Sequence, residues 1–485
     1  MNRSVSDIEI EAVVGSEVGQ VAARPDPSRL ELGGKLAGMS LPRQVVALAI
    51  WPLLEQLMNV LVGTVDLALA GRLDPQSIAV TATDALGVSG YVGWLMGMIH
   101  ASVGIGSTAL IARAVGASHK RLANAALGQS LLLAVGSGVI VGSVVYAAAP
   151  VIGWLANLDE QALAMCVQYL RIVALAAPAS AILLVANACL RGSGDTRSPF
   201  VVMVAVNVIN IAASVLFVYG PAPIGGHGVA GIAAGTLVAW IIGAILIMGV
   251  LIRGNGIVRL RLLRLRPHRH TLHRIMGVGV PSLVESVGGM WLGNFLVLMI
   301  VGSLAIPGAI GAHMIAIRVE SLSFLPGFAL GIAAATLVGQ YLGLGDPHRA
   351  RQATHLCWAM GVVLMGLLGV AFYLVPQAFV RLMTDAPPLM AMSPTLIRVC
   401  GPIQVFFATQ LVLAAAMRGA GDTRMTMLMT AGSTFLVRLP AVYLLGVVFG
   451  YGLTGVWFAL CGELVLRGVL FAWRFQHGGW AKVQV

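Results

Sequence analysis

Long apolar runs recur along the whole chain, and they constrain its fold more than any other feature. The sequence has 485 residues, of which 58% are hydrophobic and 10% are charged. Soluble proteins are about half apolar and about a quarter charged, so this chain has too few charges to cover a water-exposed surface of its size. Apolar runs of about 20 residues or more are long enough to cross a bilayer as helices, and they indicate an all-α polytopic membrane protein. A transmembrane β-barrel is excluded because its strands alternate in polarity.

The apolar runs divide into twelve expected spans, six in each half of the chain. In the first half they cover residues 43–70, 78–112, 122–149, 162–189, 197–219 and 229–252. In the second half they cover residues 272–302, 308–342, 350–375, 389–416, 425–446 and 453–474. Several spans exceed the ~20 residues that a bilayer requires, so we expect tilt or extension beyond the membrane.

Positive charges gather in alternate loops, and this predicts the orientation of the chain. The loops on one side carry most of the Arg and Lys residues, including seven arginines from Arg253 to Arg274, whereas the other side carries only Arg72 and Arg381. Because cytoplasmic loops are enriched in these residues, we expect both termini in the cytoplasm of a multi-pass inner (plasma) membrane protein. Loops of this kind touch anionic lipid and explain the net charge of +11, so membrane lipids, not nucleic acid, are the expected partners.

Nothing in the sequence indicates a metal site or a cofactor. The five cysteines lie in apolar segments without CxxC spacing, which argues against a disulfide framework and a metal centre. Three histidines, His268, His270 and His273, share the basic loop, where the surrounding positive charge disfavours a bound cation. No phosphate-binding P-loop occurs, so ATP is not expected to be the direct energy source.

The two halves of the chain share a heptapeptide. Residues 191–197 read Arg-Gly-Ser-Gly-Asp-Thr-Arg and residues 418–424 read Arg-Gly-Ala-Gly-Asp-Thr-Arg, identical at six of seven positions and 227 residues apart. The segment from Gly104 to Gly116 aligns with that from Gly331 to Gly343 at the same separation. An internal repeat of this kind indicates that the chain arose by doubling of a six-span half.

The repeat predicts the relationship between the halves. Because each half has an even number of spans, both halves enter the membrane in the same direction, and a pseudo-twofold axis along the membrane normal relates two six-helix lobes with a cavity between them. The expected divisions are a cytoplasmic tail, a first lobe, a basic linker, a second lobe and a second cytoplasmic tail, at residues 1–42, 43–252, 253–271, 272–475 and 476–485.

Each heptapeptide lies between the fourth and fifth spans of its half, and its chemistry fits a tight turn between two helices. In the first copy, Arg191 would meet the negative dipole end of the preceding helix. Gly194 would allow positive φ, and Asp195 would cap the following helix. We therefore interpret the motif as structural and do not expect it to bind substrate. In the second copy the same roles fall to Arg418, Gly421 and Asp422.

The first span carries an unusual polar stripe. Glu55, Asn59 and Asp66 are separated by four and seven residues, so Glu55 and Asp66 share one helix face about three turns, or ~16 Å, apart. A charge inside a membrane is costly, so each such residue is a functional candidate that is expected to face a cavity. We expect Asp66 to be a proton or ion site. Glu55 would have a transport role or would form a structural hydrogen bond near Pro52, and Asn59 is a candidate substrate-binding residue.

The second half carries further candidates. Glu285 is the counterpart of Glu55, and we expect it to bind a cationic substrate, take part in coupling or be structural. Met290 is a candidate substrate contact because adaptable Met side chains suit varied ligands. Glu463 and Arg467 are four residues apart in one span and are expected to pair directly.

Several motifs together resemble the MATE (multidrug and toxic compound extrusion) family, in its prokaryotic form, over roughly residues 43–475. They are the doubled RGxGDTR, the segment from Pro52 to Leu57, Val65-Asp66 with Ala70-Gly71, and Leu325 to Phe328 continuing through Val338 to Gln340. The resemblance implies two six-helix lobes that form a V, alternating access, and export of drugs or metabolites driven by entry of H⁺ or Na⁺. It also makes Gln340 a candidate substrate-binding residue.

The resemblance extends to single residues. Asp66 resembles the family's first-helix coupling aspartate, and Asn187 and Asn210 match polar residues that the family places around it. Where some members have a further aspartate this chain has Ser214, and where NorM-like members have an aspartate in span ten it has Phe407. The pattern is therefore closer to the DinF-like branch. It favours H⁺ over Na⁺, because a dehydrated Na⁺ requires several hard oxygen ligands.

These observations predict a secondary antiporter, acting as a monomer, that exports amphipathic and often cationic organic compounds in exchange for protons. One alternative is a lipid-linked oligosaccharide or metabolite flippase of the wider superfamily, which would need a large cationic cavity. Another is an intramembrane enzyme using Glu55 and Asp66, but their ~16 Å separation exceeds the reach of paired acid–base catalysis. The only expected cofactor is the coupling ion.

Overall fold

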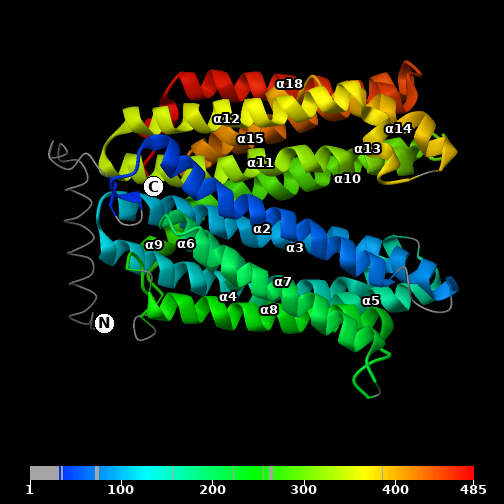
Figure 1. Cartoon of the computed structure of the whole chain (residues 1–485), viewed down its shortest axis with the longest axis horizontal. Helices are drawn as coiled ribbons and strands as arrows, with labels where there is room; N and C mark the ends of the chain where they lie inside the picture. The colour runs from blue at the N-terminus through cyan, green and yellow to red at the C-terminus, as the bar shows by residue number, and fades with distance from the viewer. Residues whose placement is uncertain are drawn as a thin grey trace.

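The apolar runs fold as helices that lie side by side along the long axis of the molecule (Figure 1). The structure, a computed structural model, describes residues 32–33, 36–70, 76–156, 158–221, 223–254, 256–261, 265, 267–384 and 386–484. Most of the expected tail at 1–42, and Arg72, lie outside these residues. Within the described part every regular element is helical, which confirms the all-α membrane fold.

The helices of the first half follow the expected spans closely. They are α2 (Leu41–Ala70), α3 (Gln76–Gly116), α4 (Lys120–Leu155), α5 (Glu160–Leu175), α6 (Ala177–Gly192), α7 (Arg197–Tyr219) and α8 (Gly228–Arg253). The fourth span is divided between α5 and α6, which meet at an angle of 53°. Pro178 follows this break, and a proline lacks the N–H that a continuous helix would require.

The second half repeats this order with more interruptions. Its elements are α9 (Arg269–Leu283), η3 (Val284–Leu292), α10 (Gly293–Ser303), α11 (Ala309–Leu344), α12 (Pro347–Leu374), α13 (Pro376–Arg381), α14 (Pro387–Cys400), α15 (Gln404–Gly419), α16 (Thr423–Ser433), η4 (Thr434–Arg438), α17 (Leu439–Tyr443), η5 (Leu444–Val448), α18 (Gly452–Gln476) and a final 3₁₀ turn, η6 (Gly479–Lys482). The tenth span bends by 60° between α14 and α15. Among the residues that the structure describes, ten helices could cross a membrane by length and composition, and the count reaches the predicted twelve if each bent pair is one span.

Three segments of the second half have π-helical hydrogen bonding. Glu285 lies in η3, within the seventh span, and Arg438 lies in η4, within the eleventh. A π segment inserts an extra residue into a helical turn and occurs frequently at functional sites. These two ionisable side chains therefore lie where the helical register is locally changed.

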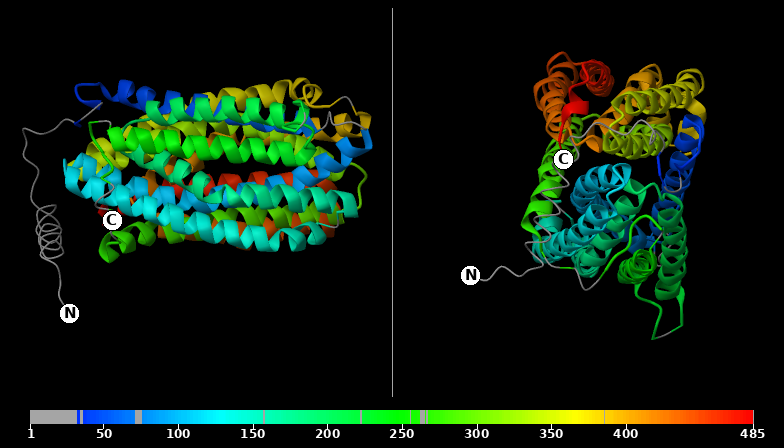
Figure 2. Two further views of the ribbon diagram at one scale, coloured as in Figure 1. Left: turned by 90° about the horizontal axis from the view of Figure 1, so that it is seen from below. Right: turned by 90° about the vertical axis from the view of Figure 1, so that its left-hand side faces the viewer.

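The first and seventh spans each pass from one half of the molecule to the other. Seen end-on, most helices of the first half gather on one side and those of the second half on the other (Figure 2). Near the start of α2, Val45 belongs to a buried cluster of second-half helices, whereas Leu69 near its end packs with α8. In the seventh span, Ile275 of α9 packs with the first half and Val297 of α10 with the second. The two crossings are equivalent, as the repeat requires.

Both heptapeptides lie at the same end of the bundle, which we call the motif end. Leu36, just before α2, shares a buried cluster there with Ala420 of the second heptapeptide and with Trp480 near the chain's last described residues. The helices α3 and α11 also cross at this end. Gly116 packs against the carbonyl of Gln340, and Gly343, its equivalent in the repeat, packs against the carbonyl of Arg113. A side chain at either glycine would separate the helices, which explains why both glycines occur in the repeat.

Candidate functional site

Each heptapeptide forms a turn of the same shape. Gly194 and Gly421 adopt φ of +88° and +90°, the left-handed region in which glycine is favoured. Asp195 accepts a hydrogen bond from the backbone N–H of Ser198 at 3.1 Å, at the start of α7. Asp422 instead pairs with Arg474 of α18 at 2.8 Å. The two turns therefore share their backbone conformation and differ in how the aspartate is held.

The arginine that opens each heptapeptide forms an ion pair with the glutamate of its half's first span. Arg191 donates to both carboxylate oxygens of Glu55 at 3.1 and 3.2 Å, and Arg418 donates to Glu285 at 2.9 Å. The sequence comparison had matched Glu55 with Glu285 and Arg191 with Arg418, but it had not paired the glutamates with the arginines. Both glutamates are thereby tied to the turns at the motif end.

Glu285 has more hydrogen-bond donors than Glu55. Thr426 and Thr430 of α16 donate to its two oxygens at 2.8 and 3.1 Å, in addition to Arg418. Its side chain is only 2% exposed. A buried carboxylate with three donors is a well-satisfied anion. Among the described contacts, Glu285 is therefore held inside its own half, and the structure does not place Asn59 or Gln340 beside it.

The two halves are hydrogen-bonded to each other through the same turns. Gln340 of α11 donates to the carbonyl of Gly192 at 3.1 Å, and Thr336, one turn earlier, donates to the carbonyl of Arg191 at 3.1 Å. In the opposite direction, Arg113 of α3 donates to the carbonyl of Ala420 at 3.1 Å. Each heptapeptide thus accepts hydrogen bonds from the second span of the other half, and Gln340 acts here as an inter-half contact.

Asp66 lies in the last two turns of α2, far from the motif end. Its Oδ1 is buried, and among the described residues it has no hydrogen-bond partner. Tyr169 of α5 packs on a buried cluster that contains Leu69 at the end of α2 and Ile232 of α8, one turn before Thr236. Thr236 in turn accepts a hydrogen bond from Asn210 of α7 at 3.1 Å. These four residues, which we call the Asp66 cluster, come from four different helices of the first half.

Several polar atoms of the first half are buried without partners in the described part of the chain. They include Oδ1 of Asn210, both amide atoms of Asn187 and the hydroxyl of Ser214. Such groups are rare in protein interiors, and each requires an explanation such as a functional role. The structure therefore brings Tyr169 to the end of α2 that carries Asp66 and bonds Asn210 to Thr236 on the neighbouring α8, whereas no described polar contact joins Asp66 to Asn187 or to Glu55.

Two further candidates lie outside these contacts. Asn59 is exposed on α2 and donates to the side chain of Gln56 at 3.1 Å. Met290 is half-buried in η3, one helical turn beyond Glu285. Their expected role in substrate binding remains a prediction.

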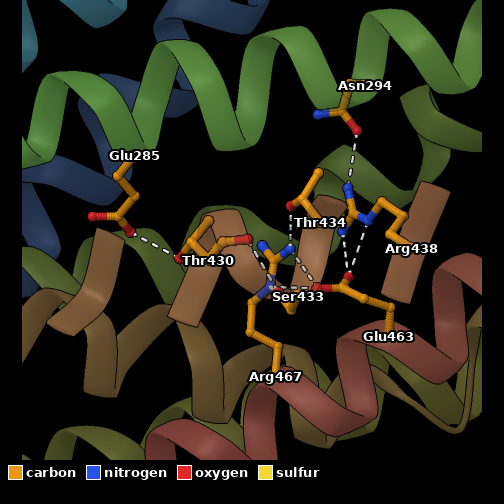
Figure 3. Close-up of polar contacts among 8 residues, drawn as sticks. All are labelled: Glu285, Asn294, Thr430, Ser433, Thr434, Arg438, Glu463 and Arg467. Carbon is orange, nitrogen blue, oxygen red and sulfur yellow. Dashed lines mark hydrogen bonds and ion pairs between the residues drawn. The ribbon is translucent and has the colours of Figure 1, made fainter. Parts of the chain in front are cut away.

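The second half contains a buried charge network that extends from Glu285 toward α10 (Figure 3). Glu463 of α18 accepts hydrogen bonds from Arg438 at 2.7 and 3.0 Å and from Arg467 at 2.7 Å. Arg438 also donates to Asn294 at 3.2 Å. The predicted pair of Glu463 and Arg467 is therefore confirmed, and Arg438 joins it as a third member.

Hydroxyl groups of the eleventh span connect this network to Glu285. Arg467 donates to Ser433 at 3.0 Å and to Thr434 at 2.9 Å. Ser433 donates to the carbonyl of Thr430, whose hydroxyl reaches Glu285. Both carboxylates of the network are thus neutralised by arginines.

Where NorM-like relatives were expected to have a carboxylate, Phe407 packs edge-on against Phe324 with ring centres 6.5 Å apart.

Arg438 and Tyr169 were not identified from the sequence. Arg438 could have been found because it is a lone charge inside an apolar run, and such a charge requires a partner from another helix. Tyr169 gave no comparable signal, because an aromatic residue inside a membrane span is ordinary. Only the packing of α5 against α8 and the end of α2 brings it to Asp66.

Comparisons with known proteins identify the family. A model of the MatE family matches residues 52–216 and again residues 281–444, one match in each half. The chain is 28% identical to the probable multidrug resistance protein NorM of Thermotoga maritima, over 91% of this chain and 93% of that protein. It is 28% identical to the multidrug resistance protein PmpM of Pseudomonas aeruginosa, over 90% and 91%.

Solved structures share the fold. One, described as an outward-facing conformation of a multidrug resistance MATE family transporter of the MOP superfamily, superposes with a TM-score of 0.83 at 20% identity, over 92% of this chain and 98% of that chain. A MOP superfamily transporter from Pyrococcus furiosus gives the same TM-score at 21% identity. The family match in both halves and the relatives matched over almost their whole length define the class as a membrane transporter. The chain belongs to the MatE family.

Proposed function

We propose that this MatE family member exports amphipathic, cationic organic compounds by antiport with protons, through alternating access. The observation that carries this proposal is the state of Asp66. The first span carries the carboxylates of Glu55 and Asp66, and the seventh span carries that of Glu285. Glu55 and Glu285 are paired with arginines, whereas Oδ1 of Asp66 is buried without a partner among the described residues. A carboxylate that lacks a fixed cation can exchange a proton for a cationic ligand.

The Asp66 cluster supports protons over Na⁺ as the coupling ion. When Asp66 is protonated it becomes a hydrogen-bond donor, and the unpartnered Oδ1 of Asn210 is an acceptor within the same cluster. A dehydrated Na⁺ would instead require several oxygen ligands around one point. In the second half, Glu285 and Glu463 are already neutralised by arginines. These features, together with Phe407, also favour the DinF-like branch.

The contacts between the halves support a gate at the motif end. Hydrogen bonds from Arg113 and Gln340, and the glycine crossing of α3 and α11, hold the two halves together there. An alternating-access transporter requires one end to close while the other exposes the site, and a set of reciprocal contacts at one end can serve as such a closure. We propose that the motif end faces the cytoplasm, with both termini on the cytoplasmic side of a cell inner membrane, because arginines concentrate in its loops.

Helix α2 would link the ion site to this gate. It carries Asp66 near one end and Glu55 three turns away, and Glu55 holds Arg191, whose carbonyl accepts the hydrogen bond of Thr336 from the other half. A change in the position of α2 on protonation of Asp66 would therefore move a turn that contacts the opposite half. Substrate and proton would compete for the state in which Asp66 is accessible, which is sufficient for exchange.

Reconstitution in liposomes tests the proposal. A pH gradient and a sodium gradient are imposed separately on the purified protein, acting as the expected monomer, while efflux of ethidium, a fluorescent organic cation, is followed. We expect efflux to respond to the pH gradient and not to the sodium gradient. A response to sodium alone would contradict proton coupling, and no response to either gradient would contradict antiport.

A further inference from the structure

A groove of about 490 Å³ opens on the outer face of the second half, between α12, α14 and α18. Among the described lining residues Arg398 of α14 carries the only formal charge, and the others include Tyr373, Ile403, Phe458 and Val465. The volume lies within the ~300–1,000 Å³ range of small-molecule sites. The groove is separate from the Asp66 cluster, which lies in the first half.

The groove results from the way the tenth span is broken. The helix stops at Cys400, and Gly401-Pro402 turns the chain by 60° before α15 begins. Across the groove, α18 contributes Gly462, and a Cβ at that position would have no atom within 4 Å. The bend and the missing side chain together leave open space that faces away from the bundle.

Arg398 lies beside the end of α12 that is far from the motif end. Its Nε–H donates to the carbonyl of Tyr373 at 3.4 Å, and Tyr373 is the penultimate residue of α12, at the end far from the motif end. Arg398 has no carboxylate partner among the described residues, and its side chain is exposed. A guanidinium has five N–H donors, so most of them remain available to a phosphate group.

The equivalent position of the first half is built differently. Arg171, which the repeat aligns with Arg398, stacks over the ring of Tyr146 at 5.2 Å. The residue equivalent to Gly462 is Val238, from the alignment of the two final spans. The arginine there is engaged by an aromatic ring, and a branched side chain replaces the glycine. The first half therefore supplies a matched control for the groove.

We propose that this groove binds an anionic phospholipid, with its phosphate on Arg398 and an acyl chain along Ile403, Phe458 and Val465. An exposed guanidinium beside an apolar groove of a membrane protein attracts a lipid phosphate, and an anionic headgroup presents that phosphate without the cation that a zwitterionic headgroup carries. The apolar walls match an acyl chain, whereas a free phosphate ion would gain nothing from them. The groove thereby anchors the bent α14–α15 span to the surrounding membrane.

Native mass spectrometry of the purified full-length protein tests this site, with added dioleoylphosphatidylglycerol (anionic) or dioleoylphosphatidylcholine (zwitterionic). The wild type is expected to retain the anionic lipid preferentially. Arg398→Gln should reduce its retention roughly five- to tenfold, the effect of about 1–1.5 kcal/mol for one charge-assisted contact. Arg398→Lys should keep most of it, and Arg171→Gln should leave it unchanged.

A second variant keeps the test decisive if Arg398→Gln fails to fold. Val465→Trp fills the groove without altering its charge and should also lower retention of the anionic lipid. Equal retention of the two lipids by the wild type, or equal loss in Arg398→Gln and Arg171→Gln, would show general surface lipid and overturn the proposal. Displacement of the lipid by inorganic phosphate, or by dodecyl sulfate at equal concentration, would identify a different anion as the occupant and would also overturn it.

Discussion

Arg113 and Gln340 occupy equivalent positions in the two sequence repeats, and each donates a hydrogen bond to the backbone of the other half's heptapeptide turn. The side chains differ, one charged and one neutral, yet the relationship is the same. The heptapeptide is thus more than a turn within its own half. Its carbonyl groups accept the hydrogen bonds that join it to the opposite half.

The gate predicts that removing one of these donors opens the motif end. With the native cysteines replaced and a single cysteine at the buried Ala420, Arg113→Ala should raise the rate of labelling by a membrane-impermeant maleimide roughly tenfold. The reason is that a charged hydrogen bond of about 1.5–3 kcal/mol is lost. Gln340→Ala should raise the rate less, because its hydrogen bond is neutral. Arg121→Ala, at an exposed arginine of α4, serves as control. Unchanged labelling in Arg113→Ala would contradict the gate.

The glycine crossing predicts matched effects in the two halves. Gly116→Ala and Gly343→Ala each place a Cβ against a backbone carbonyl of the opposite half, and each should cost about 1–3 kcal/mol of stability as overpacking. Gly136→Ala, on a face of α4 with no atom within 4 Å, should be neutral or slightly stabilising. Thermal unfolding in detergent measures all three. A loss at Gly136 as large as at Gly116 would show that the crossing has no special role.

The ion pair of Glu55 and Arg191 predicts non-additive effects. Glu55→Gln and Arg191→Gln should each slow export, and the double variant should be no slower than either single variant, because both remove the same contact. The pair of Asp346 and Arg349, whose side chains are 20% and 43% exposed, should contribute under about 1 kcal/mol and serves as control. Additive losses would indicate that Glu55 acts separately from Arg191, for example as a second proton carrier.

The charge network predicts strong dependence on Glu463. Glu463→Gln leaves Arg438 and Arg467 without their shared carboxylate and should cost about 3–5 kcal/mol. Replacing all three residues by Met should recover much of this loss, since an apolar core of similar volume can match a buried ion network. Asp84→Asn, at an exposed carboxylate of α3, is the control in thermal unfolding. A triple variant less stable than Glu463→Gln would argue that the network is not primarily structural.

Much of the helical arrangement could be predicted because it follows from the length and number of the apolar runs and from the internal repeat. Twelve spans follow from apolar runs, and the equivalence of Glu55 with Glu285 follows from the repeat. The ion pairs do not follow, because Glu55 and Arg191 are 136 residues apart and nothing local specifies which arginine meets which glutamate. The π segment at Glu285 could not be predicted either, since the register change depends on packing against α16.

In the candidate site, too, some residues could be identified from the sequence and others only from the packing of the helices. Asp66 could be singled out because a lone acid in an apolar run is costly, whatever surrounds it. Its neighbour Tyr169 could not, because a tyrosine in a span carries no such cost. Gln340 was expected to bind substrate, yet the structure places it on the backbone of Gly192, a contact that exists only because the two halves close there.

We propose that Asp66 exchanges its proton for a cationic substrate, and this exchange can be measured as proton release on binding. Ethidium is added to the purified protein in weakly buffered detergent solution, and the pH change is recorded for the wild type and for Asp66→Asn. We predict that the wild type releases protons as it binds ethidium and that Asp66→Asn binds without release. Equal proton release by Asp66→Asn would contradict the account.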